Sequence, residues 1–194
     1  MTSKKEQEPL YDFALQQKNP WTTQTIKEVY NNSWINISHR EVLDPSGNSG
    51  IYGKVHFKNL AVGVLPLGAD HHTWLVGQYR YTLNAYSWEI PEGGCLLGTD
   101  PLETAKRELY EETGIAANKW SELLRIHTSN SVTDEYGVVY VARDLTFGES
   151  APESTEELVV KKISFDKVLE LVMNGTITDS LTIAAVLKAK ILYF

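Results

Sequence analysis

The sequence predicts a mixed α/β fold whose first half is rich in strands. Three observations lead to this prediction. Short runs of β-branched and aromatic residues, broken by turn residues, fill most of residues 34–90. A helix with clear start and stop signals follows at residues 100–113. Near the end of the chain, apolar residues recur at helical spacing. At 194 residues, the chain has the length of one ordinary domain.

Turn signals separate the predicted strands. Combinations of Gly, Pro, Asn and Asp mark residues 44–48 and 68–70, and Lys-Asn marks residues 58–59. Residues 1–20 are polar, and we expect them to form a loosely held arm. The strands are expected at residues 34–43, 51–57, 60–67, 73–81, 86–90, 122–127, 137–144 and 158–163.

The first predicted helix carries signals at both ends. Asp100 is the expected N-cap, Pro101 takes the first helical position, and Glu103 completes a capping box. Gly114 supplies the left-handed residue that ends the helix. Two further helices are expected at residues 165–174 and 179–192.

Charge and cysteine usage exclude several classes of protein. The net charge is −7, and the acid-rich segments 99–115 and 149–157 account for all of it. No basic stripe is visible, so we expect no nucleic-acid partner. The only cysteine, Cys95, cannot form an internal disulfide, which fits a reducing compartment. Without a secretory signal or an apolar run of ~20 residues, the chain is expected to be cytoplasmic, with no membrane partner.

Three glutamates crowd the end of the first predicted helix. Glu108 and Glu112 are four residues apart and share a face, and Glu111 lies beside both. The C-terminal end of a helix is electronegative and disfavours each acid by about 0.3–1 kcal/mol. A divalent cation reverses this cost, because the carboxylates then become its ligands. Arg107 is spaced to pair with Glu103 or Glu111 and hold the cluster in place.

Two features flank the glutamates. Leu102, Ala105 and Leu109 recur at helical spacing and predict the stripe that packs on the sheet. Upstream, Glu-Gly-Gly at residues 92–94 predicts a tight turn in which the backbone can approach a ligand.

Residues 93–115 resemble the Nudix hydrolase signature, G-x5-E-x7-R-E-U-x-E-E-x-G-U, in which U is a bulky aliphatic residue. Gly93 opens the match, and residues 107–115 complete it without a mismatch. Thr99 replaces the first glutamate, a position that in the family mainly supports the geometry between loop and helix. The resemblance implies an α/β/α sandwich with a mixed β-sheet, in which the glutamate-bearing helix follows a Gly-rich loop and a C-terminal helix closes the fold. It also implies hydrolysis of a nucleoside diphosphate linked to another group.

The residues before this signature resemble one branch of the family. Gln78-Tyr79-Arg80 and the run Trp88-Glu89-Ile90-Pro91-Glu92-Gly93-Gly94 are similar to segments of ADP-ribose and nucleotide-sugar pyrophosphatases. The resemblance implies that Arg80 contacts a phosphate and that Glu89 and Glu135 belong to the substrate site. Residues 131–135 resemble the branch's G-x-S-[DE]-E loop but lack its glycine. Trp88 is interpreted as a core residue or, alternatively, as a stacking surface for a base.

The resemblance also implies a metal centre. Glu108 and Glu112 are the expected ligands of Mg²⁺, or alternatively Mn²⁺, together with Glu156 and a backbone carbonyl near Glu92. Glu112 is also counted among the catalytic residues. The carboxylate that removes a proton from water stays open among Glu111, Glu153 and Glu157.

The expected function is metal-dependent hydrolysis of ADP-ribose or a nucleotide sugar to a nucleoside monophosphate and a sugar phosphate. One alternative is a Nudix hydrolase of another nucleoside diphosphate derivative, such as a dinucleoside polyphosphate or a nucleotide cofactor. Another is a non-catalytic nucleotide-binding Nudix domain. Residues 1–50 are expected to supply an N-terminal arm and strands that form a homodimer, and residues 51–194 the Nudix hydrolase domain.

Overall fold

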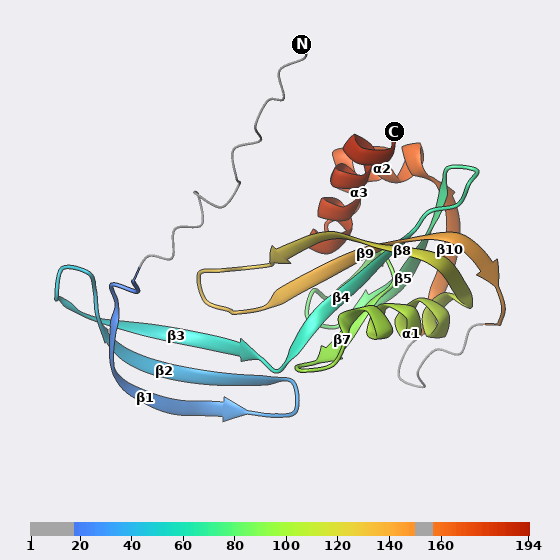
Figure 1. The fold of residues 1–194 in the computed structure, drawn as a ribbon. Helices are drawn as coiled ribbons and strands as arrows, with labels where there is room; N and C mark the ends of the chain where they lie inside the picture. The colour runs from blue at the N-terminus through green and yellow to red at the C-terminus, as the bar shows by residue number, and fades with distance from the viewer. Residues whose placement is uncertain (1–17, 150–156) are drawn as a thin grey trace, which may run out of the picture.

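The computed structural model describes residues 18–149 and 157–194. It confirms the α/β/α sandwich with a mixed sheet, and a separate N-terminal sheet projects from one end of it (Figure 1). The strands are β1 (Thr22–Asn31), β2 (Ile35–Leu43), β3 (Ser49–Phe57), β4 (Asn59–Pro66), β5 (His72–Arg80), β6 (Ala85–Glu89), β7 (Glu92–Leu96), β8 (Ile115–His127), β9 (Tyr136–Phe147) and β10 (Val159–Ser164). The helices are α1 (Pro101–Thr113), α2 (Phe165–Met173) and α3 (Ser180–Tyr193).

The central sheet has the order β7-β4-β9-β8, with β4 and β9 parallel and the two outer pairs antiparallel. The residues of β4 serve both layers of helices. Val62 and Val64 are fully buried and pack on the side of α1, whereas Leu65 packs on the side of α2 and α3. A strand covered on both faces reads as a continuous apolar run, as residues 60–67 do.

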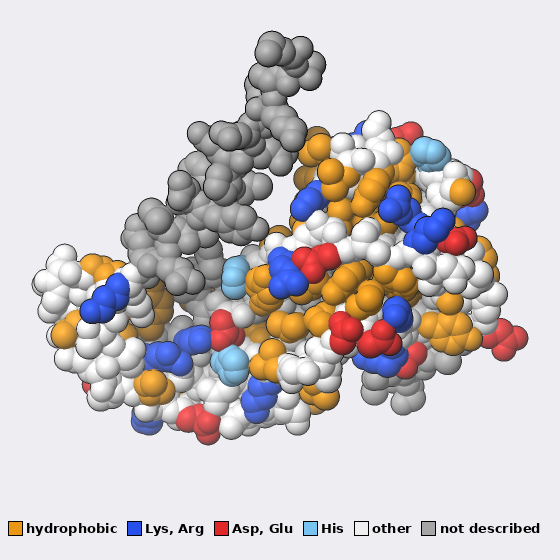
Figure 2. Space-filling model, viewed as in Figure 1, with side chains coloured by type: hydrophobic (Ala, Val, Ile, Leu, Met, Phe, Trp, Pro, Cys, Tyr) orange, Lys and Arg blue, Asp and Glu red, His pale blue; other side chains and the backbone are white. Residues whose placement is uncertain are grey.

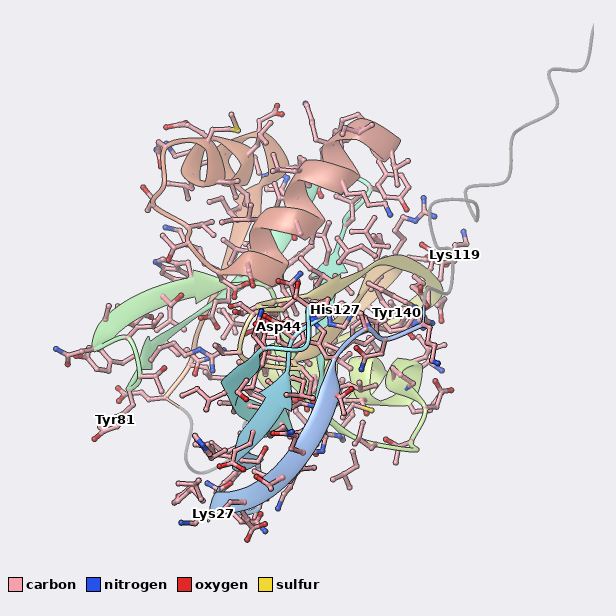
Figure 3. All side chains as sticks on the ribbon, turned by 90° about the vertical axis from the view of Figure 1, so that its left-hand side faces the viewer. Lys27, Asp44, Tyr81, Lys119, His127 and Tyr140 are labelled. Carbon is pink, nitrogen blue, oxygen red and sulfur yellow. The ribbon has the colours of Figure 1, made fainter. Side chains whose placement is uncertain are left out.

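A second sheet, β10-β5-β6, is antiparallel throughout. Its β5–β6 hairpin extends from the sandwich and carries Tyr81 at its tip, where the side chain points into solvent (Figure 3). None of the helices among residues 18–149 and 157–194 is long and apolar enough to cross a membrane.

The N-terminal sheet is an antiparallel meander of β1, β2 and β3, with β1 on the outer edge, where Lys27 lies (Figure 3). The predicted turn at residues 44–48 joins β2 to β3. The Asp44 carboxylate accepts hydrogen bonds from the backbone N–H groups of Ser46 and Asn48, at 2.8 and 2.9 Å. Gly47 has a φ of 87°, which glycine adopts without steric cost.

Three predictions of local structure differ from what the chain adopts. No strand is predicted between residues 20 and 34, yet β1 spans ten residues. All residues of β1 are exposed, so no alternation of buried and exposed side chains marks it. The tight turn predicted at residues 92–94 is wrong, because β7 pairs Gly93 with Val62 across the ladder to β4. Finally, β8 begins at Ile115, well before the predicted start at residue 122.

Candidate active site

Helix α1 lies along the central sheet with its apolar stripe inward, as the spacing predicts. Ala105 and Leu109 are fully buried in the cluster that includes residues of β4 and β9. The Asp100 carboxylate caps the helix by accepting a hydrogen bond from Leu102 N at 2.9 Å. Gly114, with a φ of 69°, ends it. These features set which helix face is turned toward β7.

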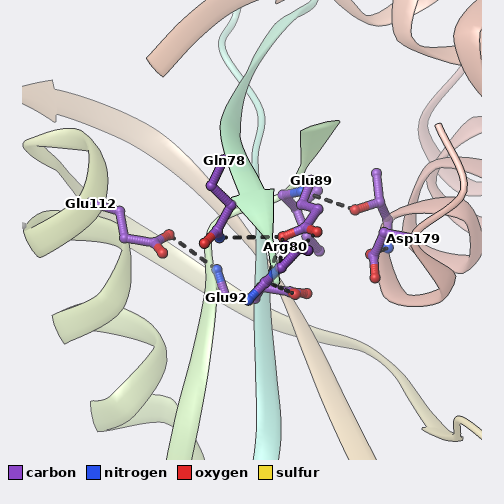
Figure 4. A network of polar contacts seen from close by, with 8 residues as sticks. Gln78, Arg80, Glu89, Glu92, Glu112 and Asp179 are labelled. Carbon is purple, nitrogen blue, oxygen red and sulfur yellow. Dashed lines mark hydrogen bonds and ion pairs between the residues drawn. The ribbon is translucent and has the colours of Figure 1, made fainter. Parts of the chain in front are cut away.

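On the face of α1 that is directed toward β7, the Glu108 side chain lies against Gly93. A methyl group at position 93 would lie 2.1 Å from a carboxylate oxygen of Glu108, so only glycine leaves room for that side chain. One turn later, Glu112 is only 3% exposed, and its carboxylate accepts a hydrogen bond from Glu92 N at 3.1 Å (Figure 4). Strand β7 and the glutamates of α1 therefore form one unit.

Arg107 neutralises part of this charge. Its guanidinium donates to Glu108 and to Glu111, each at 2.5 Å, while Glu103 pairs with Lys106 instead. Partial burial lowers the pKa of Arg107, but the charges of Glu108 and Glu111 outweigh this effect and raise it above its usual value. The arginine therefore stays protonated and links two of the three glutamates.

Thr99, at the position of the missing motif glutamate, takes part in the connection between β7 and α1. Its hydroxyl donates to Leu96 O at 2.7 Å and lies 3.0 Å from the Cys95 sulfur. The loop before the helix is thus held by a short neutral side chain.

A second charged cluster lies beside the first, where β5, β6 and β7 approach the start of α3 (Figure 4). Arg80 Nε is 3.0 Å from one Glu89 oxygen and 3.1 Å from the other, and Arg80 Nη2 is 2.8 Å from Glu92. Gln78 Nε2 donates to Glu89 at 3.4 Å. Asp179, the N-cap of α3, completes the group.

The carboxylates of this cluster outnumber its arginine. Oxygens of Glu89, Glu92 and Asp179 lie within 4.8 Å of one another. Burial raises the pKa of Glu92, and the charges of Asp179 and Glu89 raise it further, against the opposing charge of Arg80. Burial lowers the pKa of Arg80, but its hydrogen bonds and charge interactions with Glu89 and Glu92 outweigh this, so its pKa is raised.

A divalent cation fits the chemistry of these donors. One oxygen of Glu92, Oε2, is buried and has no hydrogen-bond partner among the residues that the structure describes. An unpartnered carboxylate oxygen in a group with excess negative charge is the kind of ligand that hard cations take. The carboxylates of Glu108 and Glu112 stand on the adjacent helix, across β7.

A pocket of about 350 Å³ opens beside both clusters. It is lined by Trp34, Phe57, Asn59, Leu60, Ala61, Arg80, Glu92, Gly93, Gly94 and Glu135. Trp34 and Phe57 come from the N-terminal sheet and its turns, and no pattern in the sequence connects either with the site. Trp88, the predicted alternative for stacking, packs against the apolar core, and Lys161 lies 5.7 Å from its ring centre.

The remaining predicted site residues lie in different surroundings. Glu135 lines the pocket, and its carboxylate accepts a hydrogen bond from the Thr128 hydroxyl. Glu111 is half-buried beside Arg107, and Glu157 is exposed just before β10. Glu153 and Glu156 lie outside the described residues. Asp179 was not predicted as a site residue, because its only signal in the sequence is that of a helix N-cap.

The acidic face of α1 packs against β7, and Arg80 lies beside it, held by two carboxylates. A site of this class is suited to bind a cation and an anionic substrate. The NUDIX domain family matches residues 57–179, which is more than half of the chain. The chain therefore belongs to the NUDIX family, as its resemblance to the signature predicts.

Individual relatives are similar over most of the chain. The "Methanol dehydrogenase activator" of Bacillus methanolicus is 31% identical over 166 residues, which cover 84% of this chain and 89% of that protein. The "ADP-ribose pyrophosphatase" of Bacillus subtilis (strain 168) is 29% identical over 162 residues, 82% of this chain and 87% of that protein. The protein of the same name from Mycobacterium tuberculosis is 33% identical over 131 residues, 66% of this chain and 63% of that protein.

A solved structure supports the fold. The "Crystal structure of ADP compounds hydrolase" superimposes with a TM-score of 0.80 at 20% sequence identity, covering 91% of this chain and 96% of the other. The matches to the two ADP-ribose pyrophosphatases confirm the predicted resemblance to that branch. By family, the chain is a Nudix pyrophosphohydrolase.

Proposed function

We propose that this protein hydrolyses the diphosphate bond of ADP-ribose or a nucleotide sugar and releases a nucleoside monophosphate and a sugar phosphate. The observation that carries the proposal is the packing of the Glu108 carboxylate on Gly93, with Glu112 bonded to the neighbouring residue of the same strand. Two of the relatives described above are named ADP-ribose pyrophosphatases, which favours ADP-ribose as the substrate.

Glu108 and Glu112 would hold the metal ion, with the carbonyl of Glu92 and the late acid Glu156, and Mg²⁺ is the proposed ion, with Mn²⁺ as the alternative. When bound, the metal neutralises charge on the diphosphate oxygens and lowers the pKa of water. Glu92 Oε2, which has no hydrogen-bond partner in the described part of the chain, adds a further acceptor beside these ligands.

The chain's own groups orient the substrate and accept a proton. Arg80 faces the pocket with its position fixed by Glu89 and Glu92, so its remaining donors can take a phosphate oxygen. Glu135 forms another part of the pocket wall. The proton acceptor is one of Glu111, Glu153 and Glu157, and a carboxylate in this role must come within hydrogen-bond reach of the attacking water.

A nucleotide cofactor is a second candidate substrate, favoured by the relative named for activating a dehydrogenase. Dehydrogenases transfer hydride to dinucleotide cofactors, which contain the same diphosphate bond as ADP-ribose. The same site would also accommodate a dinucleoside polyphosphate, or bind a nucleotide without hydrolysing it.

One assay separates these functions. The purified chain is incubated with ADP-ribose, a UDP-sugar, an oxidised nicotinamide dinucleotide and a dinucleoside polyphosphate, each with and without Mg²⁺. We expect release of AMP from ADP-ribose only when the metal is present. Turnover restricted to the dinucleotide would favour the second candidate, and binding without any turnover would favour a sensor.

We further propose a cytoplasmic homodimer joined through its N-terminal residues, without a nucleic-acid or membrane partner. The N-terminal sheet and the segments beside it expose large apolar side chains, which are Trp21, Ile26, Val29, Tyr30, Trp34, Ile51 and Tyr52. Exposed apolar surface of this kind is typical of an interface. On the face seen in Figure 2, basic side chains are scattered among acidic ones, without the continuous basic stripe that binds nucleic acid.

A further inference from the structure

The loop between β8 and β9, residues 128–135, is attached to the N-terminal sheet through the Asp134 carboxylate and through its backbone. Asp134 Oδ2 lies 2.7 Å from Lys54 Nζ and 2.7 Å from His56 Nδ1, and both of these partners belong to β3. The other oxygen, Oδ1, accepts a hydrogen bond from Phe57 N at 2.9 Å. Three groups at the end of β3 therefore converge on Asp134.

Backbone bonds complete this attachment. Asp134 N donates to Val55 O at 3.2 Å, and Val55 N donates to Val132 O at 2.9 Å. Val55 also forms a parallel bridge with Thr133. The loop thus adds a short parallel segment to the edge of β3, and the Asp134 side chain lies where that segment ends.

The residue after Asp134 is the pocket residue Glu135. On its other side, Gly137 pairs with Ala61 of β4, in the centre of the sandwich. The backbone on one side of Glu135 is therefore attached to the N-terminal sheet, and on the other side it is attached to the central sheet. It lines the pocket together with Arg80 and Glu92.

We infer that Asp134 is a positioning residue for the hydrolytic reaction: by fastening the loop to β3, it sets where Glu135 stands in the substrate pocket. The inference rests on the proposed function. The same attachment fixes the position of the N-terminal sheet relative to α1. Trp34 and Phe57 of that sheet and its turns line the same pocket.

The charge state of Asp134 agrees with this role. Partial burial opposes its ionisation, but hydrogen bonds from Lys54, His56 and Phe57 N outweigh that effect and hold the pKa of Asp134 at about 2. The carboxylate is therefore ionised at neutral pH and able to bind both basic side chains of β3.

A double-mutant cycle on the full chain tests the inference. Asp134→Asn keeps the shape of the side chain but removes its charge, and we expect kcat/KM for ADP-ribose to fall by about 10- to 100-fold, because small displacements of a positioned group are costly. In the Glu135→Gln background, the same substitution should change kcat/KM by less than about twofold, since its target is already lost. Asp144→Asn, an exposed carboxylate on β9, is the matched control and should leave the rate unchanged.

Amide hydrogen exchange supplies a readout that does not depend on activity. In Asp134→Asn, the backbone amides of Val55 and of the substituted residue should exchange at least about tenfold faster than the same two amides of the wild type, whereas those of α1 should not change. If Asp134→Asn fails to fold, Lys54→Met takes its place in both measurements.

Additive effects in the cycle, full activity of Glu135→Gln, or unchanged exchange at residues 55 and 134 would each overturn the role of Asp134. A wild-type chain inert toward every nucleotide tested would count against the proposed function instead. The exchange rates would then still decide whether Asp134 anchors the loop.

Discussion

Glu112 is buried in the last turn of α1, at the end of the helix that disfavours negative charge. The structure offers it a hydrogen bond from Glu92 N, and Glu108 lies on the same face one turn earlier. A divalent cation beside it would offset the cost of burying this charge, because the carboxylate then becomes a ligand. The position of Glu112 therefore favours its proposed role in metal binding.

Replacing Glu112 with Gln tests that argument. The amide oxygen can still accept from Glu92 N, so the fold should persist, and removing a charge from the helix end should leave the melting temperature equal or higher when no metal is present. With Mg²⁺, kcat for ADP-ribose should fall by at least about 100-fold, since even outer-shell partners of a metal are worth about 10–100-fold. Glu103→Gln, on the exposed side of α1, is the control. Equal rates for Glu112→Gln and wild type would contradict the role.

Trp34 is 66% exposed and stands in the wall of the pocket that also contains Arg80. An exposed indole beside the arginine that we propose to bind phosphate is suited to stack on a base, and such stacking is worth about 1–3 kcal/mol per base. Trp34→Ala should therefore raise KM for ADP-ribose about fivefold or more, with a smaller change in kcat. Tyr81→Ala, at the tip of the β5–β6 hairpin, is the control and should leave both constants unchanged (Figure 3). A change in kcat alone would argue against stacking.

At the scale of elements, the contact between β7 and α1 is the decisive one. The strand contributes no side chain at Gly93, and its backbone contacts the helix through Glu108 and Glu112. The pairing of β7 with β4 fixes the positions of these two carboxylates, and the Gly-Gly sequence does not predict this pairing. The segment predicted as a turn thus supports the helix face that we propose to bind the metal.

Gly93→Ala should disrupt this support. Its new methyl group would meet the Glu108 carboxylate, so that side chain must move, and kcat should fall by about 100-fold or more. The atoms that must shift lie at the flexible end of the Glu108 side chain, so urea unfolding should show little loss of stability. At Gly94 a methyl group would lie 3.1 Å from the end of the Asn59 side chain, which can give way, so Gly94→Ala is the matched control. Comparable losses in the two variants would show that the contact with Glu108 is not special.

For the whole molecule, metal binding and stability should be linked. Mg²⁺ at about 100 times its Kd should stabilise the folded chain by about 2.7 kcal/mol, provided the unfolded chain does not bind it. For a protein of this size, that corresponds to a rise in melting temperature of about 5–10 °C. Thermal unfolding with Mg²⁺ or EDTA measures this shift. Glu108→Gln should reduce the shift, whereas an unchanged shift would place the metal elsewhere.

The N-terminal sheet determines how the molecule assembles in our proposal. Ile51, 71% exposed on β3, is the most exposed of its large apolar residues. Light scattering should give the mass of a dimer for the wild type, and Ile51→Asp should shift the equilibrium toward the 21.8 kDa chain. Met173→Asp, on an equally exposed apolar residue of α2, should leave the mass unchanged. A monomeric wild type would contradict the dimer.

The elements that could be predicted from the sequence are those whose residues carry local signals. Most strands follow the predicted ranges, since their apolar runs are bounded by turn residues, and α1 begins and ends at its expected caps. The glutamates of α1 were identified because their spacing and their place at the helix end need no knowledge of distant contacts. The family follows from the same short segment.

Features that depend on partners far apart in the chain became visible only in the folded molecule. β1 has no buried face, so its pairing with β2 left no trace in its pattern. Trp34 joins the pocket, and Asp179 joins Glu89 and Glu92, through the folding of separate elements onto one another. Local preferences depend on neighbouring residues, whereas a site assembled from several elements exists only once their packing has fixed its geometry.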